Sequence, residues 1–179
     1  GKSAAEKRKE IGAAIVAEGC DAAVLTAPDS IAWLLNVRGG DVPRAPMPLS
    51  FAIVHGSSSV DWFVDPRKLA PGLGGHIGNG VSIAPVSAFP AALEALDGKT
   101  VRVDPGSTAA LVFDRLRTGG AIVSTGDDPC ALPKACKNKV EIAGARAAHA
   151  RDGIALSKFL AWFAEVAPSG ELSEIAAAG

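Results

Sequence analysis

The sequence predicts an α/β protein in which a mixed sheet is layered with helices. Short apolar segments of strand length alternate along the chain with segments of helical period, which is typical of a sheet covered by helices. Hydrophobic residues make up 48% of the 179 residues, which is enough for a packed core. No internal repeat or low-complexity segment interrupts this order. A globular α/β fold is therefore expected.

The first predicted element is a helix over residues 3–18. Ser3 followed by Glu6 is a capping box, in which each side chain accepts a hydrogen bond from the other residue's backbone amide. Gly19 ends the helix. Lys7-Arg8-Lys9 alternates with apolar positions and is interpreted as a solvated face of this helix.

A buried strand and a short helix are predicted next. Residues 21–26 form an apolar run typical of a buried strand. Pro28 suits the first turn of a helix that continues to Leu35, and Asp29 or Ser30 is expected to satisfy the free backbone amides of that turn.

Segments beyond residue 48 complete the predicted sheet and its helices. Two apolar runs, 49–55 and 60–65, flank Gly56-Ser-Ser-Ser59 and predict a hairpin. The remaining segments are, in order, a glycine-weakened helix within 66–76, a strand at 81–85, a helix at 88–96, a strand at 100–104, a helix at 108–117 and a strand at 121–124.

A much longer helix follows a turn that begins at residue 126. Asn138 and Glu141 form a second capping box, and the helical pattern then continues to about Val166. At a rise of 1.5 Å per residue this helix is roughly 42 Å long, whereas a typical strand spans ~17–20 Å. It is too long to cover only the small sheet that precedes it.

The second half of the long helix is apolar almost all round and needs burial on more than one side. Nothing else in the chain is large enough to supply both sides. We therefore expect 1–125 to be one domain, 126–137 a linker, and 138–179 the first helices of a further domain whose remainder this sequence lacks.

Composition argues against several classes of partner. The chain has 18 basic and 19 acidic side chains, so it has no bulk attraction for nucleic acid or anionic lipid. No apolar run approaches the ~20 residues needed to span a bilayer. Three cysteines are too few for a disulfide framework, which favours a reducing, cytoplasmic location.

Two stretches carry a resemblance to a known family. The first runs from Asp29 to Val42 and includes Asn36-Val-Arg-Gly-Gly-Asp-Val; Pro46 and Ser50-Phe-Ala52 follow it. The second comprises Pro133-Lys134, Lys137-Asn138, Glu141-Ile142, Ala148-His149, Asp152-Gly-Ile-Ala155, Phe159, Trp162, Pro168-Ser-Gly-Glu171 and Ser173-Glu-Ile175. At this spacing the two stretches resemble the middle domain of long aminopeptidases P and its junction with the catalytic domain. These enzymes belong to the creatinase/aminopeptidase P family.

This resemblance implies a creatinase N-terminal-like, ribonuclease H-like middle domain followed by the start of a pita-bread domain. The parent enzyme would be a homodimer that removes the N-terminal residue preceding a proline. Its pita-bread domain would hold two divalent metals, usually manganese, through two Asp, one His and two Glu. All five ligands would lie downstream of this sequence, so no catalytic or metal-binding residue is assigned here and no peptidase activity is expected of this chain alone.

Arg38 and Asp41 are candidate substrate-access residues, because they lie on a glycine-bearing loop between a helix and a strand. In the family this loop faces the catalytic domain or a neighbouring subunit. Arg44 is a third candidate; many relatives carry His there, and arginine removes a group that titrates near neutrality. The structural alternative is that Arg38 and Asp41 pair with each other or cap backbone groups, while Gly39 and Gly40 supply positive φ.

Two other functions stay open. One is a stand-alone interaction or dimerisation module without a catalytic partner. The other is the equivalent domain of a prolidase or creatinase, which would share the fold and differ in substrate. A protein that functions alone should not expose a contiguous apolar patch. Exposure of the apolar side chains in the long helix would therefore argue against a stand-alone module. These side chains are Ile154, Leu156, Phe159, Trp162 and Phe163.

Overall fold

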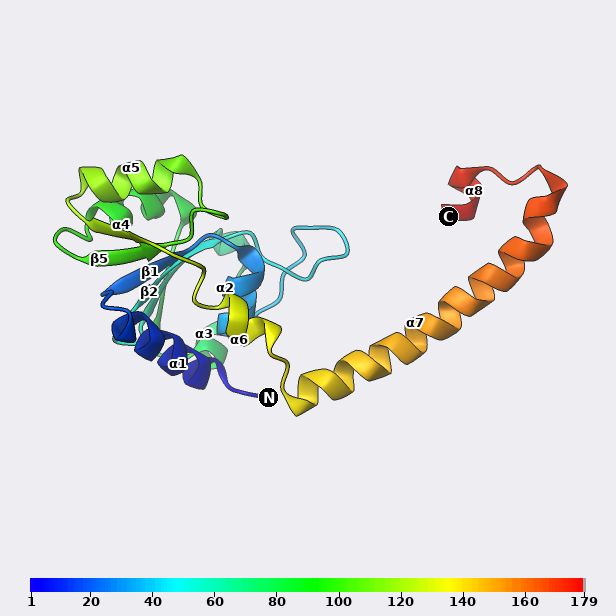
Figure 1. The fold of residues 1–179 in the computed structure, drawn as a ribbon, viewed down its shortest axis with the longest axis horizontal. Coiled ribbons are helices and arrows are strands. Elements are labelled where there is room, and N and C mark those ends of the chain that lie inside the picture. The colour runs from blue at the N-terminus through cyan, green and yellow to red at the C-terminus, as the bar shows by residue number, and fades with distance from the viewer. Residues whose placement is uncertain (179) are drawn as a thin grey trace. The chain divides into compact units, whose positions relative to one another are not determined.

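The computed structural model describes residues 1–178, which form two compact units. Lys2–Cys136 form an α/β unit, and the residues from Lys137 onward form a helical unit (Figure 1). The mixed α/β architecture and the long C-terminal helix predicted from the sequence are both confirmed.

The α/β unit is built on a six-stranded sheet with the order β4-β3-β2-β1-β5-β6. The strands are β1 (Ala22–Leu25), β2 (Phe51–His55), β3 (Val60–Phe63), β4 (Val81–Ala84), β5 (Thr100–Val103) and β6 (Ile122–Thr125). β2 pairs antiparallel with both β1 and β3, and the other neighbours pair in parallel. β2 and β3 are the predicted hairpin.

Helices cover both faces of this sheet. Figure 1 shows α1, α2 and α3 on one face and α4 and α5 on the other. The helices are α1 (Ala4–Ala17), α2 (Pro28–Leu35), α3 (Leu73–Ile77), α4 (Phe89–Glu94), α5 (Ala110–Thr118) and α6 (Ala131–Ala135), with 3-10 turns η1 (Pro66–Lys68) and η2 (Val86–Ala88). The result is a three-layer α/β/α arrangement.

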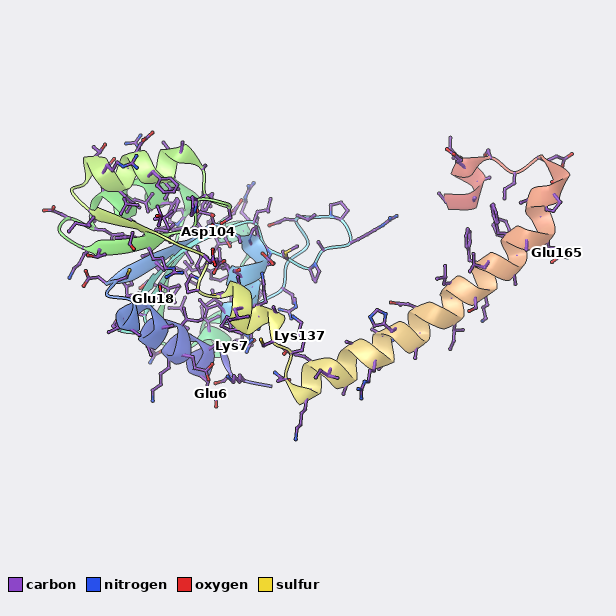
Figure 2. All side chains as sticks on the ribbon, in the orientation of Figure 1. Glu6, Lys7, Glu18, Asp104, Lys137 and Glu165 are labelled. Atoms are coloured by element: carbon purple, nitrogen blue, oxygen red, sulfur yellow. The ribbon has the colours of Figure 1, made fainter. Side chains whose placement is uncertain are left out.

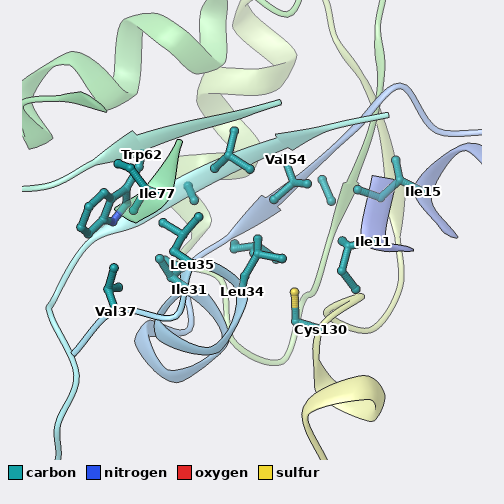
Figure 3. Packing of buried hydrophobic residues seen from close by; sticks show 14 of the residues in the cluster. Ile11, Ile15, Ile31, Leu34, Leu35, Val37, Val54, Trp62, Ile77 and Cys130 are labelled. Atoms are coloured by element: carbon teal, nitrogen blue, oxygen red, sulfur yellow. The ribbon is translucent and has the colours of Figure 1, made fainter. Parts of the chain in front are cut away.

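Two hydrophobic cores fill the spaces between the layers. Successive strand residues point to opposite faces. Ala23 and Leu25 therefore pack with α1 and α2, whereas Ala22 and Val24 pack with α4 and α5. Figure 3 shows part of the first core, in which residues of α1 and α2 meet residues of β2 and β3.

Two basic side chains of α1 are buried, so the prediction of a solvated basic face is wrong for them. Lys7 is 5% exposed and Arg8 is 7% exposed, because both lie on the helix stripe that also contains Ile11. Lys7 Nζ donates to the carbonyl of Trp33 at 2.8 Å, and Arg8 Nη1 donates to the carbonyl of Ile77 at 2.8 Å. Figure 2 shows Lys7 on the inner side of α1 and Glu6 on its outer side.

The first turn of α2 does not use the cap expected from the sequence. Its N-cap residue is Ala27, and neither Asp29 nor Ser30 caps the helix through its side chain. The Asp29 carboxylate instead forms an ion pair with Lys134 of α6. Pro28 does occupy the first turn, as predicted.

Residues 126–136 pack on the α/β unit through a short helix. Cys130, which immediately precedes α6, is fully buried in the core formed by α1 and α2 (Figure 3). The compact unit ends at Cys136. This part of the chain, assigned to a linker from the sequence, is therefore held in place by core packing and by the ion pair to Asp29.

The helical unit consists of α7 (Lys139–Val166), the 3-10 turn η3 (Ala167–Ser169) and α8 (Glu174–Ala178). The predicted capping box begins α7. Asn138 Oδ1 accepts from the amides of Val140 and Glu141 at 3.0 Å, and Glu141 Oε2 accepts from the Asn138 amide at 2.8 Å. Within residues 1–178, no helix combines the length and apolarity needed to cross a membrane.

The C-terminal half of α7 exposes apolar side chains on more than one side of the helix. None of its 28 residues is buried. The Phe159 ring lies 5.7 Å from Trp162 and 5.9 Å from Phe163, measured between ring centroids. The most exposed of these side chains are aliphatic, Ile154 at 60% and Leu156 at 57%. The apolar patch expected from the sequence is therefore present on the surface of this unit.

Candidate functional site

The loop between α2 and β2, residues 36–50, carries all three candidate residues. It begins at Asn36, which caps the C-terminus of α2 in the left-handed conformation, at φ 54°. Lys7 Nζ donates to Asn36 Oδ1 at 2.6 Å, and His76 Nε2 lies 3.0 Å from the Asn36 carbonyl oxygen. Side chains from α1 and α3 thus fix the point at which the loop leaves α2.

Arg38 is exposed, and its guanidinium is anchored at one nitrogen only. Nη1 donates to the carbonyl of Val37 at 2.8 Å and lies 3.5 Å from the carbonyl of Ala32. Nε and Nη2 have no partner among the described residues. A guanidinium has five N–H donors, so most of the donors of Arg38 remain available.

Asp41 is held by two donors from outside its own turn. Its Oδ2 accepts from Lys68 Nζ at 2.6 Å and from the backbone amide of Leu49 at 2.7 Å. The hydrogen bond from Lys68 and then that from Leu49 lower the pKa of the Asp41 carboxyl below its usual value. In the described chain Asp41 does not pair with Arg38, so that part of the structural alternative is wrong, although each residue does bond backbone groups.

The glycines of the loop serve a different purpose from the one expected. Neither Gly39 nor Gly40 has a positive φ. A Cβ on Gly39 would lie 2.7 Å from the backbone nitrogen of Pro48, so only glycine lets the two arms of the loop approach this closely. The residues of the loop with a positive φ are instead Asn36, at φ 54°, and Arg44, at φ 65°.

A cavity of about 300 Å³ lies against the inner side of the loop. Arg38 and Asp41 line it, and Arg44 is not among the described residues that do. Its apolar wall comes from Val37, Pro48, Trp62, Val64 and Leu73. The structure therefore brings two of the three sequence candidates to one cavity and leaves the third outside it.

Sequence reasoning missed two residues of this cavity, Trp62 and Lys68. Trp62 is 2% exposed, and its indole Nε1 has no hydrogen-bond partner among the described residues. Figure 3 shows Trp62 on the same side of the core as Val37 and Ile77. Lys68 lies 27 positions from Asp41 in the sequence, and no local pattern signals a contact over that separation.

A second cavity, of about 660 Å³, lies near the hairpin turn and is lined by His55, Ser57, Ser59 and Lys99 among others. His55 Nε2 lies 2.8 Å from Asp61 Oδ2. No serine hydroxyl of the described residues hydrogen-bonds to the His55 ring, so this cavity lacks a nucleophile paired with a base.

No metal centre is formed by the residues that the structure describes: they contain no group of three or more His, Cys, Asp or Glu placed to hold an ion. Cys130 is buried and Cys136 is exposed, and both are free thiols. The loop and its cavity bring together two cationic side chains, Arg38 and Lys68, the anchored carboxylate of Asp41, and an apolar wall.

Comparisons with known proteins identify close sequence relatives. Residues 1–141 match the family model described as Creatinase/Prolidase N-terminal domain. The chain is 38% identical over 167 residues to Xaa-Pro aminopeptidase 1 of Dictyostelium discoideum, covering 92% of this chain and 26% of that protein. It is 35% identical over 171 residues to the probable Xaa-Pro aminopeptidase P of Aspergillus oryzae, covering 90% of this chain and 26% of that protein. The chain thus spans about a quarter of the length of these relatives.

Solved structures show the same fold. The X-prolyl aminopeptidase of Caenorhabditis elegans, described as a cytosolic enzyme with a di-nuclear active site, matches with a TM-score of 0.80 and 29% identity. The match covers 94% of this chain and 28% of that one. The Xaa-Pro dipeptidase of Bacillus anthracis matches with a TM-score of 0.69 and 13% identity, over 89% of this chain and 44% of that one, which shows a shared fold alone.

The match to the family model covers well over half of the sequence, and it includes the whole α/β unit and the start of α7. The chain belongs to the creatinase/prolidase N-terminal domain family.

Proposed function

We propose that this chain is the non-catalytic domain that precedes the catalytic domain of a Xaa-Pro aminopeptidase. The observation that carries the proposal is that both Xaa-Pro aminopeptidase relatives align over at least 90% of this chain, which reaches well into α7 and beyond the α/β unit. The role of the domain is to position the catalytic domain and, through Arg38, Asp41 and Arg44, to shape the route by which peptide reaches it.

The parent enzyme would act on peptides with proline at the second position and use two divalent metals, manganese being the expected one. The metal ligands would come from the catalytic domain, since the described residues offer no suitable cluster. A cytoplasmic location and a homodimeric state complete the proposal. The Caenorhabditis elegans relative, described as cytosolic and di-nuclear, supports the location and the metal count.

Within the parent, residues 1–125 would form the middle domain, 126–137 the linker and 138–179 the first helices of the catalytic domain. The exposed apolar face of α7 supports this assignment, because an aromatic and aliphatic surface of this kind is stabilised when another layer covers it. The linker would be anchored to the middle domain at Cys130 and Lys134.

The second candidate function is a stand-alone interaction or dimerisation module. The exposed apolar residues of α7 argue against it, because a protein that functions alone should not expose such a patch. A prolidase or creatinase domain is the other alternative, since the Bacillus anthracis dipeptidase shares the fold. The loop sequence Asn36-Val-Arg-Gly-Gly-Asp-Val42 favours the aminopeptidase.

The test compares this chain with the full-length protein encoded by its gene. Loaded with manganese, the full-length protein should cleave a Xaa-Pro peptide, and the 179-residue chain should not. Cleavage by the chain alone would contradict its non-catalytic role, and failure of the full-length protein would contradict the substrate assignment.

The access role is tested in the full-length protein with Arg38→Gln, Asp41→Asn and Arg44→Gln. Each should lower kcat/KM by raising KM, since these residues act before the chemical step. Arg117→Gln is the matched control, because Arg117 is exposed on α5 and lies outside the loop. Unchanged kinetics in all three loop variants would refute the access role.

A further inference from the structure

We propose that the cavity behind the loop 36–50 is a binding site for one apolar amino acid residue, either as the free amino acid or as the terminal residue of a peptide. The residue's side chain would enter the cavity, and its charged groups would meet Arg38 and Asp41 at the rim. This site lies entirely within the α/β unit. Binding there does not require the access role or a catalytic domain.

The size and wall of the cavity fit a single apolar residue. Its volume of about 300 Å³ is at the lower end of the range for small-molecule sites. Val37 and Val64 are 6% and 1% exposed, so this part of the wall is fixed by the core. Pro48 and Leu73 close the other sides. A side chain such as that of leucine is small enough to enter a cavity of this volume.

The rim presents opposite charges that are not used on each other. Asp41 Oδ2 is occupied by Lys68 and Leu49, which holds the carboxylate in place, whereas its Oδ1 has no partner among the described residues. Arg38 is anchored at Nη1 and keeps Nε and Nη2 for an incoming carboxylate. Because both groups are already positioned, an α-ammonium and an α-carboxylate could be bound with little loss of side-chain entropy.

Trp62 provides a spectroscopic reporter in the wall of the cavity. Its buried indole N–H has no acceptor among the described residues, although buried polar groups are nearly always hydrogen-bonded. This unsatisfied donor belongs to a residue of the cavity wall. A ligand that enters the cavity would alter its surroundings, which makes the indole N–H a direct reporter of occupancy.

The experiment is a titration of the ¹⁵N-labelled chain with L-leucine, followed by the indole N–H resonances. The chain has three tryptophans, and Trp62→Phe assigns the relevant resonance. L-leucine should shift the Trp62 resonance saturably, with a Kd on the order of 1 mM, and leave the Trp162 resonance unchanged. No saturable shift up to about 50 mM would overturn the proposal.

Ligands with blocked charged groups show whether the site takes a free amino acid or a terminal residue of a peptide. They also test the roles of Arg38 and Asp41. N-acetyl-L-leucine amide has neither charge and should bind at least about tenfold more weakly than L-leucine. L-leucinamide keeps only the α-ammonium, so if it binds as well as L-leucine the site accepts the N-terminal residue of a peptide. N-acetyl-L-leucine keeps only the α-carboxylate, so if it binds as well as L-leucine the site accepts the C-terminal residue. Equal binding of the doubly blocked ligand would overturn the role of Arg38 and Asp41.

Variants locate the site without relying on a single substitution. Arg38→Gln should weaken L-leucine binding about tenfold, whereas Arg117→Gln, the same change on α5 outside the cavity, should leave it unaltered. Ala70→Phe places a larger side chain at the cavity and should abolish binding while the rest of the spectrum is preserved. Equal effects of the Arg38 and Arg117 changes, or normal binding in the Ala70 variant, would contradict this location.

Discussion

Gly119→Ala is expected to destabilise the α/β unit through packing alone. Gly119 ends α5 with φ −77°, a conformation that alanine adopts readily, so backbone strain plays no part. A Cβ at this position would lie 2.4 Å from the carbonyl oxygen of Glu94 and 2.5 Å from its Cα. Both atoms belong to the backbone at the end of α4, so relief requires α4 and α5 to move apart.

The size of the effect follows from that movement. Overpacking of a close contact costs about 1–3 kcal/mol, and contact with fixed backbone atoms places Gly119→Ala at the upper end, about 2–3 kcal/mol. For a unit of this size the melting temperature should fall by roughly 6–10 °C. Urea unfolding followed by tryptophan fluorescence measures the change in midpoint, and the m-value should stay constant.

The matched control is Gly75→Ala, the same substitution in α3. A Cβ on Gly75 would meet no atom within 4 Å outside its own helix turn, and the φ of Gly75 is not positive. The change should therefore stabilise the unit by about 0.5 kcal/mol, because alanine restricts the unfolded chain. The two substitutions should therefore change the free energy of unfolding in opposite directions. A Gly119→Ala protein as stable as the parent chain would refute the close contact between α4 and α5.

Three further outcomes are expected. The hydrogen bond from Lys134 lowers the pKa of Asp29, so Asp29→Asn should lower the unfolding free energy at pH 7 by at most about 1 kcal/mol. In urea titrations at several pH values that difference should vanish as the pH falls from about 4 through the lowered pKa, because protonated Asp29 no longer forms the ion pair. Burial raises the pKa of the Cys130 thiol, whereas Cys136 is exposed. A thiol reagent should therefore modify Cys136 in the native protein and Cys130 only after unfolding. Rapid modification of Cys130 in the native protein would contradict its burial. Trp162→Ser should reduce concentration-dependent association in sedimentation experiments, and an association constant unaffected by this change would exclude the α7 face as the contact.

The features that the sequence predicted well are set by neighbouring residues. The capping box of α1 involves Ser3 and Glu6, and the hairpin of β2 and β3 is closed by four intervening residues. Patterns of this range can be seen directly in a sequence. The same is true of α7, whose length and apolar second half follow from its period.

The features that were missed depend on partners far along the chain. Lys7 is buried because Trp33 and Asn36 supply acceptors, and Asp41 is anchored because Lys68 reaches it from the turn after β3. Gly39 is required by the approach of the other arm of its loop, not by its own φ. Local patterns therefore placed the candidate residues on one loop without showing how their charges are used.

The position of β1 has a consequence for how the chain acquires its structure. β1 pairs with β2 on one side, about 30 residues away, and with β5 on the other, about 80 residues away. Closing the longer loop costs more chain entropy and needs β5 to be present. During synthesis the central strand therefore has a partner on one edge only until residue 103 has emerged, and its other edge stays open to pairing with another chain in that interval.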